Sequence, residues 1–348
     1  MQSLVNKTEL WLNHLWHRGR EFLNCQYAVM GGAMTWVSEH HLVAAISNAG
    51  GFGVLASGAM SPEQLAKEIL ATRRLTKQSF GVNLITLHPK LDEMVNICLE
   101  LQATHVVLAG GLPPIGAITR IKQSGVKLIC FAPTLGIAKK LIRSGVDALV
   151  IEGAEAGGHI GPVATAVLAQ EILPVIREVP VFVAGGIGRG EMIVAYLEMG
   201  AAGVQLGTKF VCAQESIAHP KMKQAFMQAQ ARDALPSVQL DQRFPIIPVR
   251  ALVNQATQKF IQFQRETISR FEQGAVDQKG AQLEIEHFWA GALRRAVLDG
   301  DIEAGSLMAG QSVGMVSGEK PVQLIVEELL SQAKQMISNR FSAMEALS

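Results

Sequence analysis

Short runs of apolar residues recur along the first two thirds of the chain, and amphipathic segments separate them. The runs contain few polar residues, which is typical of parallel strands that are covered on both faces. They begin at Ala28, Phe52, Phe80, His105, Lys127, Ala148, Val181 and Gly203. In the segments between them, apolar positions repeat at helical spacing. The pattern therefore predicts eight strand–helix units and an α/β fold.

Eight units match the number in a TIM (β/α)8 barrel. The alternative is a doubly wound Rossmann sheet, which predicts a G-x-G-x-x-G turn after the first strand. The first strand is followed instead by Gly31-Gly32-Ala33-Met34, and the glycine-rich stretch 185–190 comes after the seventh strand. We therefore predict the barrel.

The pattern changes outside residues 27–215, which we assign to the barrel. Residues 1–26 are predicted to be a helical extension, with an apolar side formed by Leu4, Leu10, Trp11, Leu15 and Phe22. Residues 216–288 look helical, without intervening strands, and contain a proline-rich loop at 243–248. We predict that they form a small helical cap subdomain on the barrel, although ordinary outer helices would give a similar pattern. Residues 289–348 are predicted to return to the barrel and to include an amphipathic helix over 322–336.

Composition and charge limit the kinds of molecule that the protein is expected to bind. The chain has 348 residues and a net charge of +1, so no global field attracts nucleic acid or an anionic membrane. The longest apolar runs are far shorter than the roughly 20 residues of a membrane span. The four cysteines form no C-x-x-C pair, which fits a reducing compartment. We expect a soluble, cytoplasmic protein.

Glycines gather where the predicted strands end, and in a barrel this face carries the active site. Gly185-Gly186 follow the seventh strand, and Gly207-Thr208 follow the eighth. In barrels, the loops at these two positions commonly bind phosphate. Glycine lets backbone N–H groups approach phosphate oxygens, and a helix start favours negative charge. These residues therefore predict a phosphate site that needs no basic side chain.

His159 is the candidate catalytic residue. It lies in a glycine-rich loop after the sixth strand, where the neighbours offer little side chain for packing. An imidazole can accept a proton, donate one or stabilise an anion. The other histidines show no metal-binding spacing such as H-E-x-x-H, so we expect no metal. His40-His41 are interpreted as residues that cap or open a helix, and His219 could touch substrate or be structural.

Three polar residues lie in or at the ends of otherwise apolar strands: Asn83, Glu152 and Gln205. An amide offers both a donor and an acceptor, so these side chains could bind a heterocycle with several ring heteroatoms. For Asn83 the alternative is an amide that is satisfied by backbone groups.

Several ordered motifs resemble the nitronate monooxygenase (2-nitropropane dioxygenase) family, which includes the flavin-dependent enoyl-ACP reductase II enzymes. The motifs are SNAGGFGVL (47–55), GAEAGGH (153–159), AGGI (184–187) and Gln205-x-Gly207-Thr208-x-Phe210. The resemblance extends from about Tyr27 to about Ser317. It implies an FMN-binding TIM barrel with a small helical domain, in which FMN lies at the barrel mouth.

The resemblance also assigns roles to residues. The active-site histidine of the family falls on His159. Together with the glycines of the same loops, the candidate cofactor-binding residues are Gly31, Gly32, Asn83, Glu152, Gly157, Gly158, Gly185, Gly186, Gln205, Leu206, Gly207 and Thr208.

Within the family, Glu152 and the strings GVNLITLHP (81–89), AQESIAHP (213–220) and GSLMAGQ (305–311) look closer to enoyl-ACP reductase II. Met30 and Ala28 depart from the family pattern. We therefore expect an FMN-dependent oxidoreductase that reduces an enoyl thioester with NADH or NADPH. The alternatives are a nitronate monooxygenase that uses O2 and a non-redox barrel that binds a phosphorylated ligand. Expected partners are a small-molecule or acyl-thioester substrate, an acyl carrier protein and a second copy of the chain.

Overall fold

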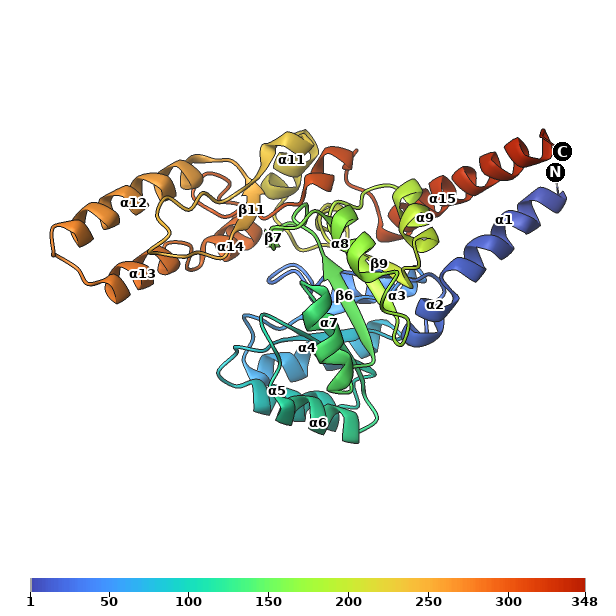
Figure 1. Cartoon of the computed structure of the whole chain (residues 1–348), viewed down its shortest axis with the longest axis horizontal. Coiled ribbons are helices and arrows are strands. Elements are labelled where there is room, and N and C mark those ends of the chain that lie inside the picture. The colour runs from blue at the N-terminus through green and yellow to red at the C-terminus, as the bar shows by residue number, and fades with distance from the viewer. Residues whose placement is uncertain (1, 348) are drawn as a thin grey trace.

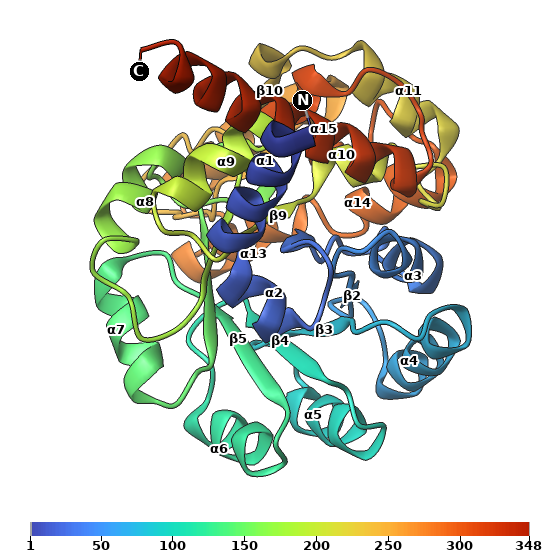
Figure 2. The ribbon, with the colours of Figure 1, turned by 90° about the vertical axis from the view of Figure 1, so that its right-hand side faces the viewer.

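The protein folds around a parallel eight-stranded barrel (Figures 1 and 2). The structure is a computed structural model that describes residues 2–347. All eight predicted strands form: β1 (Val29–Gly31), β2 (Val54–Ala56), β3 (Gly81–Ile85), β4 (His105–Ala109), β5 (Lys127–Phe131), β6 (Ala148–Glu152), β8 (Val181–Ala184) and β9 (Gly203–Leu206). Their order is β1-β9-β8-β6-β5-β4-β3-β2.

The barrel closes between its first two units. The Phe52 N–H donates to the Val29 carbonyl, the Gly31 N–H donates to the Phe52 carbonyl, and both distances are 2.9 Å. A parallel bridge between Met30 and Phe52 marks the same seam. The predicted TIM (β/α)8 barrel is thereby confirmed.

Helices surround the strands, as Figure 2 shows. They are α3 (His40–Asn48), α4 (Pro62–Leu75), α5 (Leu91–Glu100), α6 (Ile115–Gln123), α7 (Leu135–Arg143), α8 (Thr165–Ile172) and α9 (Gly190–Glu198), with the short α10 (Thr208–Val211) after β9. The start of α4 shows the local logic. The Ser61 side chain accepts from the Gln64 N–H, the Gln64 side chain accepts from the Ser61 N–H, and Pro62 occupies the first turn. None of the helices within residues 2–347 is long and apolar enough to cross a membrane.

The N-terminal segment forms two helices, α1 (Gln2–Leu15) and α2 (His17–Leu23). The predicted apolar side is correct only in part, because Leu15 and Phe22 pack against the core whereas Leu10 and Trp11 are exposed. The buried side contains Thr8, Leu12 and Trp16, which are spaced four residues apart and therefore lie on one helix face.

The partner of α1 is the C-terminal helix α15 (Val322–Glu345), and the two lie side by side in Figure 1. Lys7 pairs with Glu345 at 2.9 Å, and Lys334 pairs with Glu9 at 3.0 Å. The predicted helix over 322–336 forms, and it continues for more than two further turns, where it packs on α1.

The region between barrel and C-terminal segment is not free of strands, which corrects the prediction for residues 216–288. It contains α11 (Pro220–Gln228), β10 (Ala234–Pro236), β11 (Val249–Leu252), α12 (Gln255–Glu272) and α13 (Gln278–His287). β11 pairs antiparallel with β10 and with β7 (Gly158–His159). These strands have two to four residues, too few for an alternating pattern to mark them in the sequence.

Helices α12 and α13 project away from the barrel in Figure 1 and have a small apolar core of their own. That core contains Phe244, Phe260, Ala281 and Ile285. The chain then passes through α14 (Ala292–Arg294), a π-helical turn (Arg295–Asp299) and a 3-10 turn (Gln311–Met315) to reach α15. The subdomain boundaries remain a prediction.

Candidate functional site

The carboxyl ends of four neighbouring strands bring most of the predicted cofactor-binding residues together. In the ladder, Met30 lies beside Gln205, Gly31 beside Leu206, and Glu152 beside Ala184. The Gly32 N–H donates to the Leu206 carbonyl at 2.8 Å. Because all barrel strands are parallel, these ends open on one face, which in barrels carries the active site.

Gly185 and Gly186 occupy backbone positions that residues with a side chain would not tolerate. Their φ angles are +98° and +72°, values that L-residues with a side chain rarely adopt. A Cβ on Gly185 would lie 2.9 Å from the Thr165 hydroxyl oxygen and 3.1 Å from the Gly153 carbonyl oxygen. The turn after β8 therefore depends on glycine and keeps its backbone accessible to a ligand.

The loop that carries Gly157 and Gly158 packs on a distant segment. A Cβ on Gly157 would lie 2.6 Å from the backbone of Gly310. The Gly310 N–H donates to the Thr208 hydroxyl at 2.9 Å. Three predicted residues and Gly310 thus share one closely packed region, and sequence reasoning missed Gly310 because it lies about a hundred positions after Thr208.

Glu155 and Thr165 were also missed. Both the N–H and the hydroxyl of Thr165 donate to Glu155 Oε2 at 2.8 Å. The Gln311 N–H donates to the Glu155 carbonyl at 2.9 Å. Glu155 therefore fixes the loop after β6 to the start of α8 and to the C-terminal segment. Its place inside the GAEAGGH motif was the only signal in the sequence.

Asn83 combines both of its predicted roles. Its Nδ2 donates to the Val107 carbonyl at 3.0 Å, so the donor half of the amide is satisfied by backbone. Among residues 2–347, nothing donates to its Oδ1. The side chain is therefore held rigidly, and its carbonyl oxygen is left as an acceptor.

Glu152 and Gln205 provide further unpaired polar groups. Burial raises the pKa of Glu152 to about 7, and no cation or donor within the described residues compensates its carboxyl. Gln205 is buried and its Nε2 points toward Gly32, 3.7 Å from where a Cβ would stand. Buried polar groups without partners are costly, so this arrangement favours a polar ligand.

A cavity of about 300 Å³ opens beside Glu152. Its lining is mostly apolar and comes from the ends of β4, β5 and β6: Gly111, Leu112, Phe131, Ala132, Pro133, Ile137, Glu152 and Gly161. A mostly apolar cavity with one ionisable group suits an organic substrate that has a polar head.

His159 lies on β7, directly opposite Val249 on β11. The residue is exposed, yet the surrounding loops desolvate its ring enough to lower the pKa of the imidazole. At neutral pH the ring is therefore neutral, with one donor and one acceptor nitrogen. The other candidate, His219, accepts from the Lys221 N–H at 3.1 Å and caps α11, which supports the structural interpretation.

Together these residues fit a ligand with a phosphate and a flat heterocycle, as FMN has. The glycines near β8 and β9 offer a close backbone approach, and Asn83, Glu152 and Gln205 offer donors and acceptors for ring heteroatoms.

Comparison with known proteins gives a consistent result. The family model for nitronate monooxygenase matches residues 17–332. FabK from Thermotoga maritima has 34% sequence identity and a TM-score of 0.84, and the match covers 94% of this chain and 98% of FabK. A nitroalkane oxidase from Streptomyces ansochromogenes has 26% identity and a TM-score of 0.73, with 89% of this chain and 97% of the other covered.

Curated relatives are more distant but cover as much of the chain. A Rhodococcus jostii protein named (3aS,4S,5R,7aS)-5-hydroxy-7a-methyl-1-oxo-octahydro-1H-indene-4-carboxyl-CoA dehydrogenase is 28% identical, over 90% of this chain and 94% of that protein. A probable nitronate monooxygenase from Staphylococcus aureus is 27% identical, over 93% of this chain and 99% of that protein.

Proposed function

Because the chain belongs to the nitronate monooxygenase family, we propose that it is an FMN-dependent oxidoreductase that reduces an enoyl thioester. The net reaction transfers a hydride from NADH or NADPH and a proton from solvent across the carbon–carbon double bond, leaving the saturated thioester and the oxidised nucleotide. FMN supplies the two-electron chemistry when it is bound.

The observation that carries this proposal is the match to FabK, an enoyl-ACP reductase II, over nearly the whole of both chains. It is supported by a second relative whose name includes a carboxyl-CoA, which is also a thioester. The cavity beside Glu152 is mostly apolar, which suits an acyl chain because the removal of apolar surface from water is favourable.

The glycine-rich turns after β8 and β9 would hold the phosphate of FMN. Gly185, Gly186, Gly207 and Thr208 are the residues concerned, and backbone N–H groups there would donate to phosphate oxygens. Asn83 Oδ1, the Gln205 amide and the Glu152 carboxyl would bind the ring system. With a pKa near 7, Glu152 can donate or accept a hydrogen bond at neutral pH.

His159 would act on the substrate. A neutral imidazole carries one N–H, and that N–H would donate to the thioester carbonyl oxygen while negative charge develops on it. The β7–β11 pairing would hold the residue in place during turnover.

Nitronate oxidation is the second candidate. It is favoured by the family model and by the relatives from Staphylococcus aureus. With a neutral nitroalkane as substrate, the acceptor nitrogen of His159 would first take the proton from the carbon beside the nitro group and so form the nitronate that is oxidised. Oxygen consumption with propyl-2-nitronate distinguishes the two functions, because uptake at the background rate removes this candidate.

Two measurements test the proposal itself. The purified protein should be yellow and should release FMN on denaturation, whereas a colourless protein that takes up no FMN would favour a non-redox barrel for a phosphorylated ligand. Oxidation of NADH or NADPH should depend on added crotonyl-CoA, and a rate that is independent of the thioester contradicts enoyl reduction.

We also propose the cytoplasm as the location, because the four cysteines are free thiols. An acyl carrier protein would deliver the substrate. Residues 216–288, as a helical cap subdomain, would form one side of the surface on which the carrier protein docks. We also propose that the protein forms a homodimer, and a measurement of its mass in solution would test this.

A further inference from the structure

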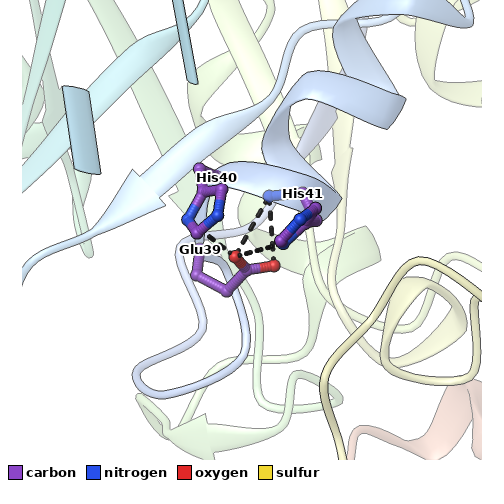
Figure 3. Close-up of side chains that lie close together, drawn as sticks. All are labelled: Glu39, His40 and His41. Atoms are coloured by element: carbon purple, nitrogen blue, oxygen red, sulfur yellow. Dashed lines mark hydrogen bonds and ion pairs between the residues drawn. The ribbon is translucent and has the colours of Figure 1, made fainter. Parts of the chain in front are cut away.

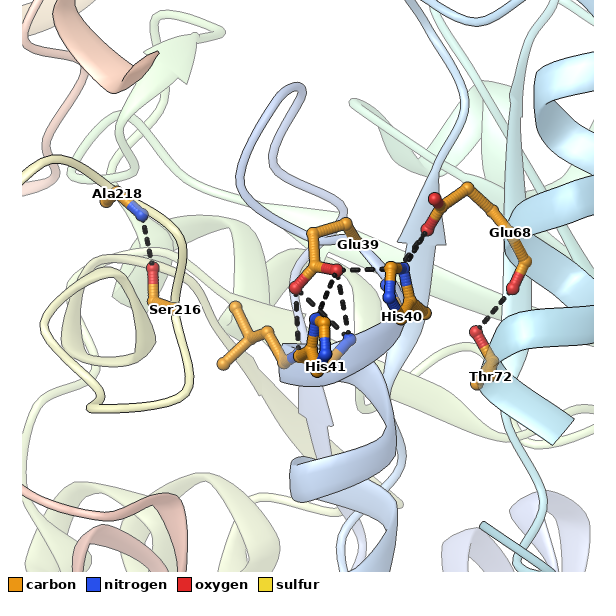
Figure 4. A network of polar contacts seen from close by, with 8 residues as sticks. Glu39, His40, His41, Glu68, Thr72, Ser216 and Ala218 are labelled. Atoms are coloured by element: carbon orange, nitrogen blue, oxygen red, sulfur yellow. Dashed lines mark hydrogen bonds and ion pairs between the residues drawn. The ribbon is translucent and has the colours of Figure 1, made fainter. Parts of the chain in front are cut away.

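Four side chains of the types that bind metal ions meet at the start of α3, after the loop that follows β1. Glu39 precedes the helix, His40 and His41 are its first two residues, and Glu68 comes from the neighbouring helix α4. Figure 3 shows the Glu39 carboxylate between the two imidazole rings, and Figure 4 shows Glu68 facing His40 from the other side.

The contacts within this group are short. His40 Nδ1 lies 2.9 Å from Oε2 of both Glu39 and Glu68, and His41 Nδ1 lies 3.1 Å from Glu39 Oε2. One ligand atom from each of Glu39, His40 and His41 lies within 4.8 Å of the others.

The imidazoles carry too few N–H groups for the carboxylate oxygens that face them. A neutral imidazole carries one N–H, so His40 Nδ1 has a single hydrogen to share between two carboxylates. The two carboxylates bring two negative charges to the group. A divalent cation held by Glu39, His40 and His41, whose ligand atoms lie within 4.8 Å of one another, would neutralise this charge, and Glu68 would remain the partner of His40.

The start of α3 uses both oxygens of Glu39. Oε1 accepts from the N–H groups of His41 and Leu42, and Oε2 also accepts from the His41 N–H at 3.1 Å while it faces both imidazoles. Glu68 Oε2 accepts from the His40 N–H at 3.0 Å and lies beside His40 Nδ1. An ion would therefore replace the contacts of Glu39 Oε2 with the imidazoles, while Oε1 would continue to cap the helix.

The spacing suits a small ion. Bonds of about 2.0–2.2 Å from zinc to nitrogen and oxygen place neighbouring ligands of a tetrahedral site roughly 3.3–3.5 Å apart. The present contacts are a few tenths of an ångström shorter, since protons lie where the ion would be. Two imidazoles with one carboxylate favour a borderline transition metal, whereas Mg²⁺ and Ca²⁺ prefer oxygen alone.

We propose that Glu39, His40 and His41 form a binding site for one divalent transition-metal ion of the zinc type, and that Glu68 of α4 orients His40. The ion would anchor the segment that leads from Gly32 to Glu39, in which the Ser38 hydroxyl donates to the Gly32 carbonyl at 2.8 Å.

The test is equilibrium dialysis of the tag-free, FMN-loaded protein against Zn²⁺, with the bound metal counted. His41→Asn and Glu39→Gln remove ligands whose side chains are 59% and 11% exposed, and circular dichroism checks that both fold. His17→Asn is the matched control, because His17 lies 3.3 Å from Glu21 on the surface in a simple histidine–glutamate pair.

The wild-type protein and His17→Asn should each bind one equivalent with the same affinity. Each of His41→Asn and Glu39→Gln should bind at least tenfold more weakly. The proposal is overturned if the wild type shows no saturable binding, or if either variant loses less than tenfold; the three residues would then serve only to cap the helix.

Discussion

His159 lies directly opposite Val249 in the β7–β11 ladder, so a strand from outside the barrel holds the loop of the candidate catalytic residue. The Ile160 N–H extends the contact by donating to the Pro248 carbonyl at 3.0 Å. Arg250, on the same strand, is buried and donates from Nε to the Ala154 carbonyl at 2.8 Å and from Nη1 to the Ala234 carbonyl. The arginine therefore ties the loop to both strands of this small sheet.

Replacement of Arg250 should loosen that connection. Arg250→Met removes two charge-assisted hydrogen bonds and should lower the free energy of unfolding by about 2 kcal/mol. It should also reduce kcat, because His159 is less well placed. Urea denaturation and steady-state kinetics measure both effects. Arg270→Met, at an exposed pair with Glu284, should change stability by less than about 1 kcal/mol; equal losses in the two variants would disprove the connection.

His159→Ala should retain FMN and lose turnover. General acid–base or hydrogen-bonding groups contribute roughly 10²–10⁴-fold to rate. Because the His159 ring makes no hydrogen bond within residues 2–347, its removal should not lower the stability of the fold. The flavin spectrum and kcat with crotonyl-CoA are the measurements, and exposed His17→Ala is the control. A kcat within twofold of wild type would make His159 a structural residue.

Gly185→Ala should weaken both the fold and the binding of FMN. The new Cβ would lie 2.9 Å from the Thr165 oxygen, at a φ of +98°, and a strained backbone of this kind costs on the order of 1–3 kcal/mol. Thermal melting and FMN titration report the two effects. Gly116→Ala is the control, because a Cβ there meets nothing within 4 Å. If Gly185→Ala binds FMN as tightly as the control, the glycine turn is not part of the cofactor site.

Glu152 should make stability depend on pH. Burial raises its pKa from 4.5 to about 7, so between these values the folded state holds a proton that the unfolded state releases. The wild type therefore loses stability as pH rises through this window. Glu152→Gln removes the effect. The free energy of unfolding of the variant, measured relative to wild type, should therefore be about 2 kcal/mol higher at pH 8 than at pH 5. Urea denaturation of the flavin-free proteins at both pH values measures the gain. If the difference in free energy of unfolding between Glu152→Gln and wild type is the same at pH 5 and pH 8, the carboxyl is already ionised at pH 5.

The barrel could be predicted because its strands are apolar runs that contrast with amphipathic helices. All eight were found, and His40-His41 do open a helix as expected. The faces of α1 were harder, because Leu10 and Trp11 are apolar but exposed, while the buried side includes Thr8. Apolar character alone could not show which side α15 covers.

The contacts that complete the site come from distant parts of the chain. Gly310 reaches Thr208, and β11 reaches His159, but neither pairing leaves a local pattern. Glu68 likewise lies on a different helix from His40, so a search for metal-binding spacing within one helix did not find the four-residue cluster. Such contacts depend on tertiary structure and become visible only when the elements are packed.

Anaerobic mixing tests the proposed reaction most directly. The FMN-loaded protein is first bleached with NADH or NADPH, and crotonyl-CoA is then added without oxygen. We predict that the oxidised flavin spectrum returns and that butyryl-CoA forms in equal amount. A flavin that neither nucleotide bleaches, or one that stays reduced with crotonyl-CoA until oxygen is admitted, would contradict it.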